Sequence, residues 1–109
     1  MTWTTQSLFP HPLSSSKVNE DVCDILVTML PSYEFGEDEG GLSGVTVNKH
    51  ILHNKQALLD YFTRKVRQCI CDLGYHCDVQ ITTSWFTATF PGGSADEHAH
   101  CNSWFSGVV

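Results

Sequence analysis

Two stretches of the chain repeat apolar residues at the spacing of an α-helix. In residues 17–30 the apolar positions fall three or four apart, at Val18, Val22, Ile25, Leu26 and Met29. This spacing predicts an amphipathic helix with one face packed on a core. The hydroxyls of residues 14–16 are placed to cap its start, and Pro31 is placed to end it.

The second helical pattern is the stronger of the two and runs from a cap at Asn54 to about residue 73. Its apolar face consists of Leu58, Tyr61, Phe62, Val66, Ile70 and Leu73. Gly74 follows at the position where a left-handed residue commonly closes a helix. Arg64, Lys65 and Arg67 fall within this helix and are expected to form an ordinary solvated face.

The remaining patterns are extended rather than helical. Residues 8–13 are expected to be extended, because a residue before proline avoids the helical region, and residues 45–47 predict a short strand. Residues 77–89 alternate with a period of two and are rich in Thr, Val, Ile and aromatic residues, as in a strand or a bent pair of strands. A turn at residues 91–94 precedes a further strand at residues 104–109. The patterns together predict an α+β chain.

Composition narrows the class of protein. A chain of 109 residues, 41% hydrophobic and 11% aromatic, is sufficient for one small folded domain. The net charge of −6, with only six Lys and Arg, argues against nucleic acid, because phosphate binding needs clustered cations. No run approaches the roughly 18 apolar residues of a membrane span, and residues 1–5 do not resemble a signal peptide. We therefore expect a cytoplasmic protein with no membrane partner.

Several side chains are weak candidates for metal binding. The five cysteines are an odd number without an export signal, and they are interpreted as thiols rather than disulfides. His11, His50 and His53 are capable ligands, but loop histidines are more commonly solvated. The acidic residues 37–39 match no calcium-loop spacing.

The densest metal-binding chemistry lies in residues 96–109, named here the histidine segment. His98 and His100 are one residue apart, so in a strand both imidazoles would project from the same face. Two neutral imidazoles suit Fe(II), Zn(II), Mn(II) or Cu(II), although a catalytic site needs at least a third protein ligand. Asp96 or Glu97 is a candidate for that carboxylate ligand. The ordinary alternative is that these are solvated residues beside a turn.

Two other classes of protein fit the same residues. A small zinc-binding module would combine thiols and imidazoles from Cys69, Cys71, His76, Cys77, His98, His100 and Cys101. Its spacing is unlike that of zinc ribbons, because two cysteines one residue apart on a helix cannot easily converge. A metal-free interaction protein is the third interpretation, with self-association or partner binding through an exposed strand edge.

The histidine segment also belongs to a longer pattern. Residues 81–86 (ITTSWF) precede a glycine-bearing turn and then His98-x-His100-x-Asn102-Ser103, followed by Ser106-Gly107-Val108. In this order the features resemble a family of 2-oxoglutarate/Fe(II)-dependent oxygenases, whose members begin with a similar extended segment and two helices. The resemblance implies a double-stranded β-helix, a jelly-roll barrel that binds Fe(II) and 2-oxoglutarate and hydroxylates a substrate that is unknown here.

The resemblance also implies roles for individual residues. His98 is the expected iron ligand, and His100 is a candidate second ligand where the wider superfamily carries a carboxylate. Asp96 and Asn102 are candidates for hydrogen bonds to the ligands. The residues that would bind 2-oxoglutarate are not assigned.

Members of this family continue beyond the motif with further barrel strands, a distal histidine and a basic residue that pairs with 2-oxoglutarate. We therefore expect residues 1–109 to be a single domain that forms the N-terminal part of such a jelly roll, incomplete and inactive alone. In this sequence Arg64 and Arg67 lie on the second predicted helix, and no arginine follows the motif.

Overall fold

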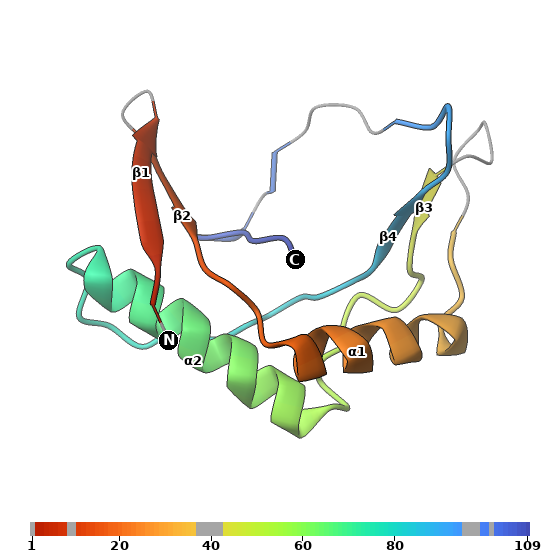
Figure 1. Cartoon of the computed structure of the whole chain (residues 1–109), viewed down its shortest axis with the longest axis horizontal. Helices are drawn as coiled ribbons and strands as arrows, with labels where there is room; N and C mark the ends of the chain where they lie inside the picture. The colour runs from red at the N-terminus through yellow and green to blue at the C-terminus, as the bar shows by residue number, and fades with distance from the viewer. Residues whose placement is uncertain (1, 9–10, 37–42, 95–98, 101) are drawn as a thin grey trace.

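The computed structural model describes residues 2–8, 11–36, 43–94, 99–100 and 102–109. Two helices and two small antiparallel sheets make up its regular structure (Figure 1), so the predicted α+β character is confirmed. The elements are β1 (Thr4–Leu8), β2 (His11–Ser15), α1 (Glu20–Met29), the 3-10 helix η1 (Leu30–Ser32), β3 (Ser43–Val45), α2 (Gln56–Asp72) and β4 (Thr87–Thr89). Neither α1 nor α2 is long and apolar enough to cross a membrane.

The N-terminal strands form an antiparallel hairpin. β1 pairs with β2 in a register that runs from Thr4 opposite Ser15 to Leu8 opposite His11. The hydroxyls of Thr5 and Ser14 are 2.8 Å apart across the pair. Residues 8 and 11–13 are therefore extended, as expected from the prolines, and residues 9–10 lie outside the described part.

Helix α1 is shorter than predicted. It begins at Glu20 rather than Lys17, because two of the serines expected to cap it belong to β2 and Ser16 donates a hydrogen bond of 2.7 Å to the carbonyl of Thr2. Glu20 and the next residue place acidic groups in the first turn, where they complement the helix dipole. The helix ends at Met29, and Pro31 lies in η1, which continues the chain as a tighter turn.

Helix α2 ends where the sequence predicts, although it begins one residue later than expected. Its N-cap is Lys55 rather than Asn54. At the other end Gly74 has a φ of 97° and donates to the carbonyl of Cys71 at 2.9 Å, while the Tyr75 amide donates to Ile70 at 3.1 Å. These two bonds form a Schellman motif, which satisfies carbonyls that the helix end leaves without partners. The prediction that Gly74 closes the helix is confirmed.

The core lies between the two helices and the turn that leads into α2. Its buried residues are Val22, Met29, Ile51, Leu52 and Leu58. Tyr33, Ile81 and Phe86 are partly buried against this cluster, so the chain after α2 also contributes to it. The helices therefore form a base from which the two sheets extend at opposite ends (Figure 1).

The expectation that Lys65 is solvated is wrong. This side chain is 3% exposed, and its Nζ donates to Ser16 Oγ at 2.7 Å. The ammonium lies 5.2 Å from the ring centroid of Trp3 and 5.8 Å from that of Tyr61. The cation is buried because residues from the N-terminal hairpin region cover this side of α2, and two aromatic faces partly replace water around it.

The strand predicted at residues 77–89 is wrong over most of its length, because only residues 87–89 form a strand. β4 pairs with β3 in an antiparallel register, and Ser84 makes a single parallel bridge to His50. The Thr46 amide donates to the Phe86 carbonyl at 3.0 Å. Regular pairing is confined to the places where residues 43–50 supply a neighbouring backbone. The strand predicted at residues 45–47 is present but shifted to Ser43–Val45.

The strand predicted at residues 104–109 is also wrong. Residues 103–109 have no strand structure, and residues 102–109 are exposed. The Trp104 ring contacts Tyr75 and Phe105, with centroids 5.1 Å and 4.6 Å apart. The contact with Tyr75 places Trp104 beside the residue that follows Gly74 at the end of α2.

Candidate metal site

The structure describes two of the four residues assigned to the candidate iron site. His100 and Asn102 are described, while Asp96 and His98 lie outside the described residues. The candidate third ligand Glu97 and the thiol Cys101 also lie outside them. The contacts that the structure shows at this site are therefore those of His100 and its neighbours.

The His100 imidazole lies beside the Trp85 indole. Their ring centroids are 5.7 Å apart and the planes are tilted by 44°. Trp85 follows Ser84, whose amide donates to the Lys49 carbonyl at 2.8 Å, so the backbone before Trp85 is fastened to the turn that precedes α2. The contact brings the histidine segment against residues 81–86, and these are two of the three parts of the oxygenase-like sequence pattern.

A cation lies on Trp85 as well. The Nζ of Lys49 is 6.0 Å from the indole centroid and donates to the Thr46 carbonyl at 2.8 Å. A cation over the face of an indole is attracted electrostatically to the ring. Trp85 is 37% exposed, so the ring is fixed by its neighbours while part of its surface stays open to solvent.

Asn102 changes the direction of the chain after the histidines. Its φ is 60°, in the left-handed region that asparagine tolerates better than most residues. Residues 99–100 are not in a strand. Strand periodicity therefore does not determine which way the side chain of His100 points.

The other candidate ligands are dispersed over the described residues. Cys69 is half-buried on α2, while Cys71, His76 and Cys77 are exposed, and His11 is exposed on β2. No three His, Cys, Asp or Glu side chains of the described residues come together in a group that could hold a metal. The zinc cluster considered from the sequence also includes His98 and Cys101, which lie outside the described residues. His50 and His53 do come together, with ring centroids 5.2 Å apart.

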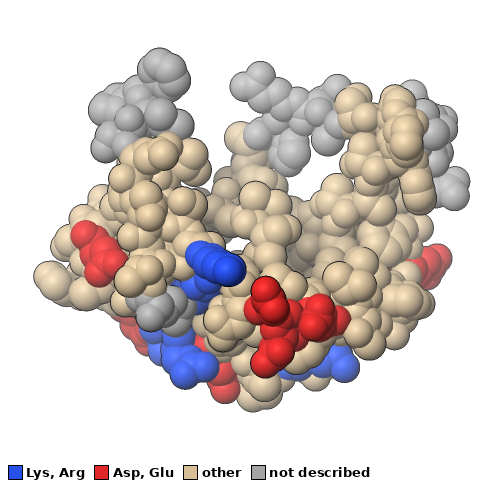
Figure 2. Space-filling view, viewed as in Figure 1, with Lys and Arg blue, Asp and Glu red and all other residues tan. Residues whose placement is uncertain are grey.

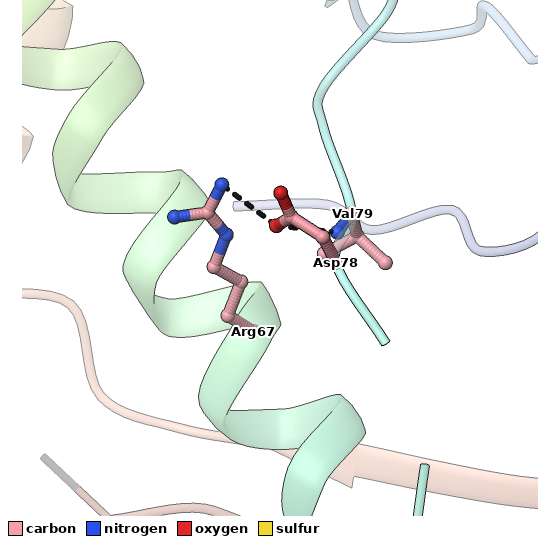
Figure 3. Close-up of polar contacts among 3 residues, drawn as sticks. All are labelled: Arg67, Asp78 and Val79. Carbon is pink, nitrogen blue, oxygen red and sulfur yellow. Dashed lines mark hydrogen bonds and ion pairs between the residues drawn. The ribbon is translucent and has the colours of Figure 1, made fainter. Parts of the chain in front are cut away.

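The arginines of α2 contact other groups of this protein. Arg67 forms an ion pair of 2.8 Å with Asp78, whose carboxylate also accepts the Val79 amide at 2.9 Å (Figure 3). Arg64 Nε lies 3.4 Å from the carbonyl of Asp60. On the face seen in Figure 2, acidic side chains gather over the first turns of α1, and basic side chains lie beside them.

Comparison of the chain with protein-family models, curated proteins and solved structures gives no significant match.

Sequence reasoning missed two features of this region. The first is that Trp85 contacts His100, and the only signal was that both residues belong to the same family-like pattern. The second is the pairing of His50 with His53. Their spacing of three residues within a turn was a usable signal, because such residues can return to the same side of the chain.

Proposed function

We propose that this chain is an Fe(II)/2-oxoglutarate-dependent dioxygenase-like protein in which His98 and His100 are metal ligands. The proposal is carried by one observation. His100 lies against Trp85, so the two segments that resemble the oxygenase family in sequence are in contact. The antiparallel pair β3 and β4, with the extended residues leading into it, would be the first strands of the jelly roll.

The donor chemistry of the site suits the proposed metal. Neutral imidazoles bind Fe(II), and two adjacent ones leave positions open for a carboxylate, for 2-oxoglutarate and for water. Bound iron together with 2-oxoglutarate would supply the oxidising chemistry for hydroxylation. Within this scheme Asp96 or Asn102 would accept or donate a hydrogen bond that orients a ligand.

Trp85 would act as a positioning residue. Its ring limits the orientations available to the His100 imidazole, since the two centroids are 5.7 Å apart. Fixing a ligand before the metal arrives lowers the entropy lost on binding. The Lys49 ammonium over the same ring steadies the indole.

The position of Trp85 provides a direct test of the proposed ligands. Adding Fe(II) without oxygen should quench the fluorescence of Trp85, because an open-shell ion held by His100 would lie close to the indole. His98→Ala should weaken this quenching by at least about tenfold in Fe(II) concentration, since changing even the outer partners of metal ligands typically weakens binding by about 10–100-fold.

Two variants serve as controls in this titration. Trp85→Phe removes the tryptophan that contacts His100, which is one of three in the chain, and keeps both imidazoles, so the share of the quenching due to Trp85 should be lost while iron still binds. His11→Ala removes an exposed histidine from β2 and should change neither the fluorescence quenching nor the binding of iron. Equal quenching curves for the unsubstituted chain and His98→Ala would overturn the proposal.

A metal-free interaction protein is the second candidate, and exposed apolar side chains favour it. Phe90, Trp104 and Val108 are 61%, 56% and 98% exposed, and among the described residues each sheet has two strands. An exposed strand edge and exposed apolar side chains both favour pairing with a second copy of the chain. Concentration-dependent dimerisation in sedimentation velocity, together with no thermal shift from Fe(II), Zn(II) or Mn(II), would support this candidate over the first.

A further inference from the structure

The turn between β3 and α2 carries two histidines in contact. The rings of His50 and His53 meet edge to face, with centroids 5.2 Å apart and planes at 90°. The His53 amide donates to the His50 carbonyl at 3.1 Å, and this turn brings both residues to the same side. Both histidines are exposed, while Ile51 and Leu52 between them are 4% and 7% exposed and anchor the turn in the core.

His50 is fixed by three separate contacts. Its amide donates to Asn48 Oδ1 at 2.8 Å, and its backbone bridges to Ser84. Its ring Nδ1 lies 3.1 Å from the carbonyl oxygen of Thr82. A carbonyl only accepts, so Nδ1 carries the proton of the neutral ring and Nε2 keeps its lone pair. A backbone carbonyl that orients the imidazole in this way is typical of histidines that bind metals.

The spacing of the two rings suits a shared ion. A Zn–N bond of about 2.0–2.1 Å plus roughly 1.1 Å from nitrogen to ring centre puts each centroid about 3.2 Å from the metal, and a tetrahedral angle then separates the centroids by about 5.2 Å. The observed separation of the His50 and His53 centroids is 5.2 Å. Edge-to-face packing without metal allows the same separation, so the experiment must distinguish the two.

We propose that His50 and His53 form a surface site for a late first-row divalent cation, with Zn(II) as its probe. Imidazole nitrogens suit Zn(II), Cu(II) and Ni(II). The two protein ligands leave the remaining positions of the ion to water or to an external donor. The Lys49 ammonium, beside the turn, donates a hydrogen bond to the Thr46 carbonyl. This carbonyl oxygen partly compensates the positive charge.

This site is independent of the oxygenase proposal, and its test is made in a background that lacks the two proposed iron ligands. The full chain with His98→Ala and His100→Ala, labelled with ¹⁵N in histidine, is titrated with Zn(II) and followed by imidazole NMR signals. Site-resolved signals separate these histidines from the thiols, which also bind Zn(II). The ring signals of His50 and His53 should shift together with a single dissociation constant.

Removing one ligand should then weaken binding at the other. In His53→Ala the Zn(II) concentration that shifts the His50 ring signal should rise by at least about tenfold. Replacing a group that only hydrogen-bonds to a metal ligand typically weakens metal binding by about 10–100-fold, and His53 is proposed as a ligand itself. The matched control, His11→Ala, should leave that concentration unchanged. The side chains of His53 and His11 are both exposed, and unchanged backbone amide spectra would confirm that the two variants keep the fold. A His50 signal that titrates identically with and without His53 would overturn the site.

Discussion

The helical base and the region after Gly74 differ in where they place their apolar side chains. Val22, Leu58 and Ile70 in the helices are 9%, 5% and 2% exposed. After the second helix, Trp104 and Val108 are 56% and 98% exposed. Burial of apolar surface is the main source of folding free energy, so the base stabilises the fold. The later region contributes less to stability, and it carries the candidate iron ligands.

Removing a core side chain should give the largest change in the free energy of unfolding. Leu58→Ala should lower the free energy of unfolding by about 2–5 kcal/mol, because it deletes buried methyl groups and leaves a cavity beside the turn before α2. Val108→Ala should change it by less than about 0.5 kcal/mol, since that side chain is 98% exposed. Urea unfolding of both variants measures the difference. Equal losses would mean that the two regions contribute alike to stability.

A smaller effect is expected at two glycines that have similar space around them. A Cβ added at Gly74 or at Gly107 would meet no atom within 4 Å. Gly74 has a φ of 97°, so Gly74→Ala should cost about 1–2 kcal/mol through backbone strain. Gly107→Ala, in the exposed chain end, should be within about 0.5 kcal/mol of the unsubstituted protein. Thermal unfolding compares them, and an unaffected Gly74→Ala would contradict the helix-closing role of this residue.

The smallest effect concerns the ion pair that joins the two regions. Arg67 and Asp78 are 49% and 81% exposed, and their charged atoms are 2.8 Å apart. A double-mutant cycle with Arg67→Ala and Asp78→Ala should give a coupling of about 0.2–1 kcal/mol, because water screens exposed pairs. The coupling should shrink further at about 1 M salt. A larger value that salt does not reduce would indicate that this contact holds the later region to the base.

The sequence predicted the parts of the fold whose determinants are close together along the chain. α2 and its end were predicted because an apolar face and Gly74 are local signals. The start of α1 was misplaced because Ser14 and Ser15 are equally suited to a helix cap and to a strand, and the pairing with β1 decides between them. The burial of Lys65 depends on Trp3 and Ser16, which the charge pattern of the helix does not reveal.

The strand predictions failed for a related physical reason. Alternating Thr, Val and aromatic residues favour an extended chain, but a strand also needs a neighbouring backbone. Residues 43–50 supply one only beside residues 84–89. Similarly, the sequence identified the spacing of His98 and His100, whereas the contact between Trp85 and His100 depends on how the chain folds back.

The most direct measurement of the central claim is the amount of Fe(II) that the chain retains in anaerobic equilibrium dialysis. The unsubstituted chain should bind about one Fe(II), held by the two imidazoles and their neighbours. His98→Ala/His100→Ala should lose this ion, while His50→Ala/His53→Ala should keep it. Equal retention of Fe(II) by the chain and by its His98→Ala/His100→Ala variant would contradict the assignment.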